Sequence, residues 1–140
     1  MEKRTVSAAI HAQELFYQVT VGLIASVWLI NGLFCKVFLM VPRHQLIVAS
    51  VLGSEHATLL TRIIGISETL VAFWIVSGYR PRTIAIIQVV VILAMNLLEF
   101  FLVPDLLLWG RVNLVFALLL VLTILYTEFK LRSSGTNAQR

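Results

Sequence analysis

Charged side chains are scarce in this 140-residue chain, since Asp, Glu, Lys and Arg together make up 13% of it. A water-soluble domain usually carries about 25% of these residues, which it needs to keep its surface hydrated. Hydrophobic residues reach 59% of the chain, against about 45–50% in soluble domains. This balance excludes a water-soluble enzyme, a disordered regulator and a disulfide scaffold, and it indicates an integral membrane protein.

Cysteine is nearly absent as well, because Cys35 is the only one. An intrachain disulfide, a CxxC redox pair and a cysteine metal cluster are therefore excluded. His11, His44 and His56 lie outside the long apolar segments, so we expect them to be solvated or interfacial. We expect neither haem ligation between helices nor a buried metal site, and no covalently bound cofactor. Phosphate-binding loops, nucleophile triads and dinucleotide fingerprints are also missing from the sequence.

Basic residues outnumber acidic ones, 11 to 7, and the formal net charge is +4. They flank the apolar segments and form no patch interleaved with aromatic residues, so no nucleic-acid partner is expected. The basic residues on the side of the two termini are Lys3, Arg4, Arg80, Arg82, Lys130, Arg132 and Arg140. The other side carries Arg43 and Arg111, with Lys36 and Arg62 just inside the helix ends. Because loops rich in Lys and Arg stay in the cytoplasm, both termini are predicted to be cytoplasmic, which argues against a dual-topology transporter.

Four apolar segments cover most of the chain, at about residues 15–40, 59–77, 83–103 and 106–126. Each is close to the ~20 residues that a helix needs to cross a ~30 Å hydrocarbon core. Short connections favour an antiparallel arrangement with both termini on one side. The sequence therefore predicts an all-α membrane protein, with one four-transmembrane-helix bundle over residues 1–132 and a flexible polar tail over 133–140.

Two connections predict local structure. Between the first two segments, Leu46, Ile47 and Val51 are apolar at helical spacing, which predicts a short interfacial helix that begins near Pro42 and ends near Gly53. Between the last two segments, Pro104 and Asp105 are expected to end the third helix and begin the fourth, with Asp105 as a candidate N-cap.

Ionisable residues inside the segments are costly to insert into a bilayer, so each is expected to have a partner or a function. Helical spacing places Gly65 and Glu68 on one face of the second segment, and Asn96 and Glu99 on one face of the third. Lipid cannot satisfy such polar atoms, so these faces should point into the bundle. Lys36 is expected to pair with Glu99 or Glu68.

These faces predict a polar cavity in the outer half of the bundle, with Asn31 and Glu68 as its floor. Trp74 is expected either to pack in the core or to form part of an apolar ligand pocket. The candidate ligand-binding residues, which include the predicted cavity wall, are Asn31, Lys36, Arg62, Glu68, Trp74, Asn96, Glu99 and Asn113. A set of purely structural hydrogen bonds and ion pairs is the alternative interpretation, and no catalytic residue can be assigned.

Several short motifs stand out along the chain. They are W-x-x-x-G-L-x-x-K at Trp28–Lys36, G-x-x-E at Gly65–Glu68, the Gly78–Arg80 turn, and the stretch from Glu99 to Asn113. These motifs resemble those of the DoxX-like family of small four-helix membrane proteins, over roughly residues 15–130. The resemblance implies a bacterial inner-membrane protein, and some relatives are associated with respiratory or thiol redox systems, including subunits of quinone-linked oxidoreductases.

Three functions remain open from the sequence. The first is binding of a small lipophilic ligand such as a quinone or a lipid, or docking of a membrane redox partner, with no electron carried by this chain itself. The second is a small proton-coupled transporter that uses Glu68 and works as a homodimer. The third is a membrane enzyme for a lipophilic substrate, with Glu68 or Glu99 as acid or base.

Overall fold

The computed structural model describes residues 2–132, and in this part of the chain it contains helices and no strands. The tail predicted over residues 133–140 lies outside the described residues. Four helices are long and apolar enough to cross a membrane, which confirms the predicted fold class. The spans they offer are Val6–Val37, Ala57–Ser77, Pro81–Leu102 and Gly110–Leu131.

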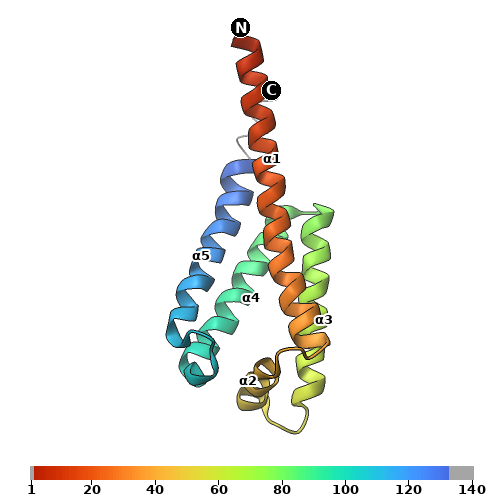
Figure 1. Ribbon diagram of the computed structural model, residues 1–140, viewed down its shortest axis with the longest axis vertical. Coiled ribbons are helices and arrows are strands. Elements are labelled where there is room, and N and C mark those ends of the chain that lie inside the picture. The colour runs from red at the N-terminus through yellow and green to blue at the C-terminus, as the bar shows by residue number, and fades with distance from the viewer. Residues whose placement is uncertain (1, 133–140) are drawn as a thin grey trace.

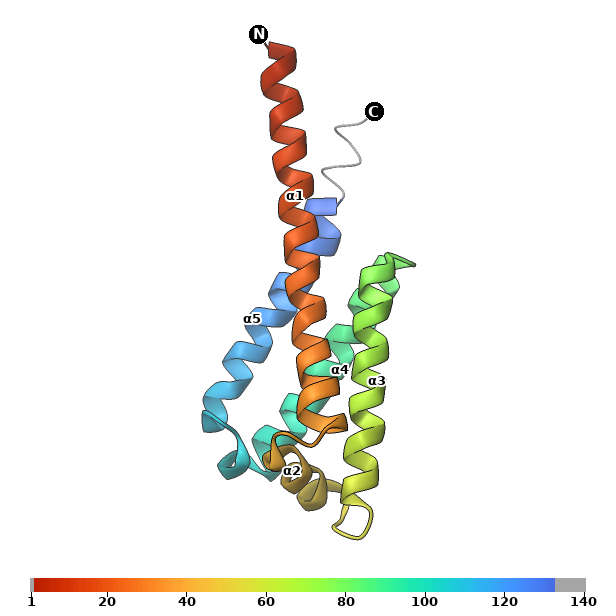
Figure 2. The same ribbon diagram turned by 45° about the vertical axis from the view of Figure 1, so that its right-hand side comes forward.

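The helices run antiparallel, as Figures 1 and 2 show. The start of α1 and the end of the last helix lie at one end of the bundle, here called the termini end. The short helix α2 lies at the other end, here called the α2 end. The elements in chain order are α1 (Glu2–Leu29), η1 (Ile30–Val37), α2 (Pro42–Leu52), α3 (Ala57–Ser77), α4 (Pro81–Leu102), η2 (Pro104–Leu106), η3 (Gly110–Val112), α5 (Asn113–Leu125) and η4 (Tyr126–Leu131).

The first spanning helix is longer than predicted. It begins at Glu2 instead of near residue 15, and α1 extends beyond the other helices at the termini end (Figure 2). From Ile30 to Val37 it continues as the π-helix η1, where the amide of Phe38 donates to the carbonyl of Leu33, five residues back. A π-helix is wider than an α-helix and is rarely longer than one turn, and the apolar pattern gave no indication of it.

The short helix between the first two spans is confirmed, since α2 covers Pro42–Leu52. The predicted start of the fourth helix at residue 106 is wrong. Pro104 has no backbone N–H to continue α4, and the chain then makes two short 3₁₀ turns, η2 and η3, before α5 begins at Asn113. Gly110 has a φ of +53°, which only glycine adopts easily. Asp105 forms no side-chain cap with either turn.

Two glycines bring the first spanning helix into close contact with α3. A Cβ atom built on Gly32 would lie 2.6 Å from the carbonyl oxygen of Gly65, and one built on Gly65 would lie 2.7 Å from the Cβ of Lys36. No larger residue fits either position without a shift of the backbone. Small residues of this kind let helix backbones approach each other in membranes, and here the approach sets the position of Lys36 over α3.

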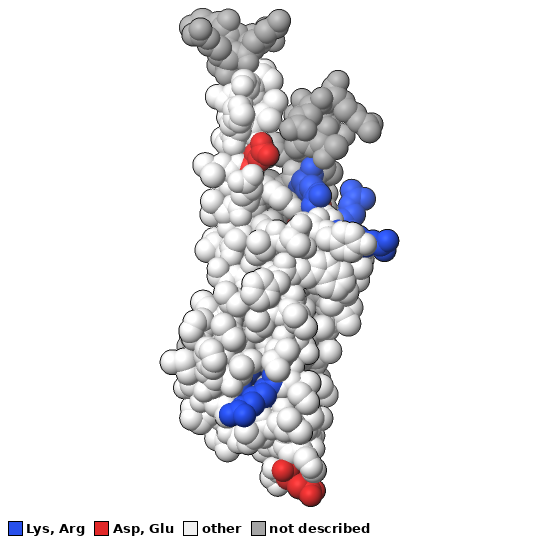
Figure 3. Space-filling view, turned by 90° about the vertical axis from the view of Figure 1, so that its right-hand side faces the viewer, with Lys and Arg blue, Asp and Glu red and all other residues white. Residues whose placement is uncertain are grey.

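An apolar core fills the half of the bundle toward the termini end. At its edge, the indole of Trp28 donates a buried hydrogen bond of 2.9 Å to Gln88. The buried residues of this core come from four helices and are Ile24, Ala25, Trp28, Ala72, Ile75, Ile84, Ala85, Ile92, Ala117, Val121 and Ile124. Figure 3 shows the matching exterior, with charged side chains toward the two ends of one face and a broad uncharged band between them.

A cluster of polar side chains joins α1 to residues 128–132 at the termini end. The hydroxyl of Tyr17 donates to Glu128 (3.0 Å) and accepts from Arg132 (3.1 Å). Glu128 is buried, and Arg132 lies 3.6 Å from its second carboxylate oxygen. Gln13 adds a hydrogen bond of 3.0 Å to the carbonyl of Leu131. These contacts hold α1 against η4 at the termini end.

Candidate functional site

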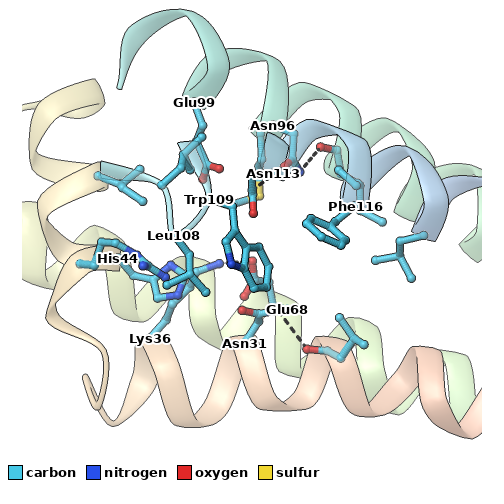
Figure 4. A pocket seen from close by; sticks show the side chains of 18 of the residues that line it. Asn31, Lys36, His44, Glu68, Asn96, Glu99, Leu108, Trp109, Asn113 and Phe116 are labelled. Carbon is cyan, nitrogen blue, oxygen red and sulfur yellow. Dashed lines mark hydrogen bonds and ion pairs between the residues drawn. The ribbon is translucent and has the colours of Figure 1, made fainter. Parts of the chain in front are cut away.

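A cavity of about 570 Å³ occupies the half of the bundle toward the α2 end (Figure 4). In Figure 4, Lys36, Glu68 and Asn31 lie on one side of it, and Glu99 and the two other asparagines lie on the opposite side. Every spanning helix and α2 contribute to its lining. The lining residues are Val27, Trp28, Asn31, Lys36, Arg43, His44, Ile47, Glu68, Ile92, Met95, Asn96, Glu99, Leu107, Leu108, Trp109, Asn113, Phe116, Ala117 and Leu120.

A buried ion pair between Lys36 and Glu68 lies against this cavity. The Lys36 ammonium group donates to Oε1 of Glu68, and the two side chains are only 6% and 7% exposed. Glu68 is therefore the partner of Lys36, one of the two that the sequence left open. The second oxygen of Glu68, Oε2, is buried and has no hydrogen-bond partner among the described residues. A buried polar atom without a partner is rare and costly, so this oxygen is an acceptor available to a bound molecule.

Three asparagines supply amide groups from three helices. Asn113 of α5 donates to the side-chain oxygen of Asn96 on α4, at 3.1 Å. Asn96 in turn donates to the backbone carbonyl of Ile92 (2.8 Å), and Asn31 donates to the carbonyl of Val27 (3.2 Å). The Asn96–Asn113 bond links α4 to α5 across the connection that the short 3₁₀ turns make, so it keeps this wall of the cavity together.

Two polar residues of the cavity come from α2, and neither was selected from the sequence. Arg43 and His44 line the cavity because α2 folds against the bundle, with Ile47 and Val48 buried. Burial, together with the positive charges of Lys36 and Arg43, lowers the pKa of His44 from 6.5 to about 4. His44 is therefore neutral at physiological pH. The amphipathic pattern of α2 was the signal that could have identified it.

Aromatic side chains form the rim of the cavity near the connection between α4 and α5. The rings of Trp109 and Phe116 pack with their centroids 4.7 Å apart. Trp109 and the adjacent Leu108 are largely exposed, as is Phe116. Beside them, the guanidinium group of Arg111 lies over the ring of Phe100, 5.5 Å from its centroid. These residues place an apolar edge next to the polar groups of the cavity, as is common in ligand pockets.

The structure brings six of the eight candidate residues to the cavity, and it leaves Arg62 and Trp74 outside the lining. Arg62 is exposed on α3, one position past the buried Thr61, which turns it about 100° away from the inward face. The indole of Trp74 donates to the carbonyl of Tyr79 (2.7 Å) at the turn between α3 and α4, near the termini end. Within residues 2–132, no group of three or more His, Cys, Asp or Glu residues could hold a metal ion.

Comparison with known proteins gives one match. The family model of the DoxX-like family matches residues 25–126. No curated protein matches the chain, and no solved structure does. The matched stretch runs from the last turns of α1 to the first residue of η4. It includes every residue that lines the cavity, and it leaves out most of α1 and most of η4.

Proposed function

This chain belongs to the DoxX-like family, and from that premise we propose that it binds a small lipophilic ligand, a quinone or a lipid, in the cavity at the α2 end. The observation that carries the proposal is the Oε2 atom of Glu68, which has no hydrogen-bond partner within residues 2–132 and is held beside the cavity by the buried ion pair with Lys36. A charge inside a spanning segment is costly, and such residues in membrane proteins usually serve a site.

The composition of the cavity supports the same function. Eleven of its nineteen lining residues are apolar or aromatic, and the other eight are polar or charged, Glu68 and Glu99 among them. Pockets of about 300–1,000 Å³ with this composition are typical of sites for small organic molecules. The lipid bilayer that surrounds the four spans is the natural source of such a molecule.

The cellular role that follows from the family resemblance is that of an accessory subunit in a membrane redox system. In this role the chain positions a quinone for a partner protein and carries no electrons itself. We place the protein in a bacterial inner membrane, with both termini in the cytoplasm and the α2 end on the outer side. Co-purification of an oxidoreductase with the mildly extracted protein supports this role, and its repeated absence argues for a ligand-binding protein that acts alone.

Extraction with the native lipids, followed by mass spectrometry of what stays bound, tests the proposal. The wild-type protein should retain a lipophilic molecule. The Glu68→Gln variant should retain at least about tenfold less, the change that 1.4 kcal/mol of lost binding free energy produces. An empty wild-type protein contradicts the proposal.

Glu128→Gln is the matched control, because Glu128 is also a buried carboxylate with one hydrogen-bond donor, but it lies at the termini end. It should retain the ligand at the wild-type level. Equal loss in both variants means that the ligand left because the bundle was destabilised, and this result supports the structural interpretation of Glu68.

A further inference from the structure

The lining of the cavity changes from polar to apolar along the bundle axis. Four of the ionisable lining residues, Lys36, Arg43, His44 and Glu99, lie near the α2 end, where α2, η1 and the end of α4 meet, and the fifth, Glu68, lies about halfway along α3, where Lys36 reaches it. The rest of the lining farther from the α2 end is apolar, from Val27 on α1 to Leu120 on α5. Val27 lies nine residues before Lys36, which is roughly 13 Å along a helix. A molecule that fills this space is therefore polar at one end and apolar at the other.

The apolar part of the cavity has an exposed rim on two helices. Val27 on α1 is 40% exposed and Phe116 on α5 is 48% exposed, although both line the cavity. α1 packs mainly on α3, whereas α5 packs on α4. Both ribbon views show α5 leaning away from α1 toward the α2 end (Figures 1 and 2). The rim lies within the spans, so the surroundings that it faces are hydrocarbon.

The formal charges around the polar end add up to zero. Lys36 and Glu68 neutralise each other as an ion pair. Arg43 and Glu99 contribute one formal charge of each sign, and neither forms an ion pair within residues 2–132. His44 is neutral, because burial and the charges of Lys36 and Arg43 lower its pKa to about 4. A head group with a net charge would bring an uncompensated charge into a site of low dielectric constant, which is costly.

The size of the cavity limits how much of a ligand it can enclose. A volume of about 570 Å³ holds a head group and the beginning of a chain, but it is too small for a complete two-chain lipid. The rest of a long-chain ligand must leave the protein, and the exposed rim at Val27 and Phe116 is where the apolar lining meets the outside.

We propose, on the basis of the ligand-binding function above, that the cavity opens sideways into the bilayer between α1 and α5. It takes a long-chain amphipath whose head group carries no net charge. The head lies among Lys36, Arg43 and Glu99, and the chain leaves between Val27 and Phe116. Phospholipids without net charge and isoprenoid quinones share this chemistry.

The fluorescence of Trp28 can test this proposal, because Trp28 lines the cavity and is only 6% exposed. The variant with Trp74→Phe and Trp109→Phe keeps Trp28 as its only tryptophan. It is placed in vesicles of phosphatidylethanolamine brominated in the middle of its chains, since bromine quenches indole fluorescence at short range. We expect a loss of Trp28 fluorescence relative to unbrominated vesicles.

Two further probes separate the possible ligands. Brominated phosphatidylglycerol, which has a net negative head, should quench Trp28 less than brominated phosphatidylethanolamine does. A long-chain quinone, itself a quencher, is added to unbrominated vesicles in the third arm. If only the neutral phospholipid or only the quinone quenches Trp28, the molecule that quenches is the ligand of the cavity. Quenching by neither overturns the sideways opening, and equal quenching by the two phospholipids overturns the condition on head charge.

Variants that fill the cavity distinguish a chain inside it from lipid outside the protein. Ala117→Phe fills the lining on α5 and should abolish the quenching of Trp28, whereas Ala94→Phe on the exposed face of α4 should not. If Ala117→Phe does not fold, Val27→Phe narrows the rim instead and should reduce the quenching. Quenching that persists in the folded filled variants contradicts the proposal.

The quenching test of the sideways opening and the extraction test of ligand binding can each fail without the other. A retained ligand that depends on Glu68, together with a Trp28 that no probe quenches, leaves the ligand site in place and removes the sideways opening. Quenching of Trp28 in a protein that retains nothing on extraction keeps the opening and removes the ligand site.

Discussion

Two carboxylates, Glu68 and Glu128, are buried in the described part of this bundle, and their surroundings differ. In each of them one oxygen accepts a hydrogen bond and the other has no hydrogen-bond partner among the described residues. In Glu128 that second oxygen lies 3.6 Å from Arg132, so the group closes the termini end as an ion pair. Of these two carboxylates only Glu68 lies in the lining of the cavity, so of the two only Glu68 can serve a ligand there.

The Lys36–Glu68 pair should be strongly coupled. Lys36→Met leaves Glu68 as an uncompensated buried charge and should lower the free energy of unfolding by about 3–5 kcal/mol. Glu68→Gln should also destabilise the protein, but the double variant should lose less than the sum of the two, because neither partner is left charged and alone. Denaturant unfolding in micelles measures all three variants, and additive losses would contradict the pairing.

His44 should make stability depend on pH. Its pKa is about 4 in the folded protein against 6.5 ordinarily, so between these values the unfolded chain binds the proton and the folded protein does not. The other ionisable residues that line the same cavity as His44 are Lys36, Arg43, Glu68 and Glu99. Stability should therefore fall as the pH drops from 6.5 toward 4, with no contribution from His44 above that range.

His44→Gln is the control, because it removes this proton but leaves the other titrating groups in place. Unfolding midpoints of both proteins are measured across that pH range. The wild type should lose stability relative to His44→Gln as the pH falls. Parallel profiles would mean that His44 is not held in its neutral form.

Single residues also show how far the sequence could predict the site. Glu68 could be found because a carboxylate in an apolar segment is conspicuous and lies in line with Gly65. Arg62 was selected with it because it lies near a helix end, although its position one residue past Thr61 turns it about 100° away from the face of Gly65 and Glu68. The amphipathic pattern of α2 indicates that one face of this helix is buried, but it could not assign His44 to the cavity, because that position depends on α2 folding back over the bundle.

At the scale of elements, the contact between η1 and α3 should tolerate no added methyl group. Gly32→Ala would place a Cβ 2.6 Å from the carbonyl oxygen of Gly65, and the forced shift should cost about 1–3 kcal/mol. Gly22→Ala, on the same helix with nothing within 4 Å, should be neutral or stabilise by up to about 1 kcal/mol. Thermal unfolding compares the two, and equal effects would contradict the close approach.

The elements differ in how well the sequence predicts them. The bounds of two of the spans, α3 and α4, follow from apolar periodicity, and those of α2 follow from Pro42 and Gly53, because these features act locally. The start of α5 does not, since residues 106–112 are nearly as apolar as a helix but are bent by Pro104 and Gly110. The π-helix η1 depends on packing against α3, which no local pattern contains.

For the molecule as a whole, we expect one orientation in the membrane. Arg80 and Arg82 lie at the termini end, which should therefore be cytoplasmic. In a Cys35→Ala background, Ser54→Cys beside α2 should react with a membrane-impermeant maleimide in intact cells. Thr83→Cys at the start of α4 should react only after the cells are permeabilised, and both positions are exposed. The reverse pattern would overturn the orientation.

The apolar core at the termini end has a consequence for the cell's energy supply. A proton or cation that reached Glu68 from the α2 end would next meet Ile24, Ile75 and Ile84, whose side chains have no polar atom to replace its hydration shell. We therefore expect the resting bundle to conduct no current, so that a cell can insert many copies without discharging its membrane potential. Proton-coupled transport through Glu68 would require these helices to part in every cycle, whereas a ligand that arrives from the bilayer leaves this insulation intact.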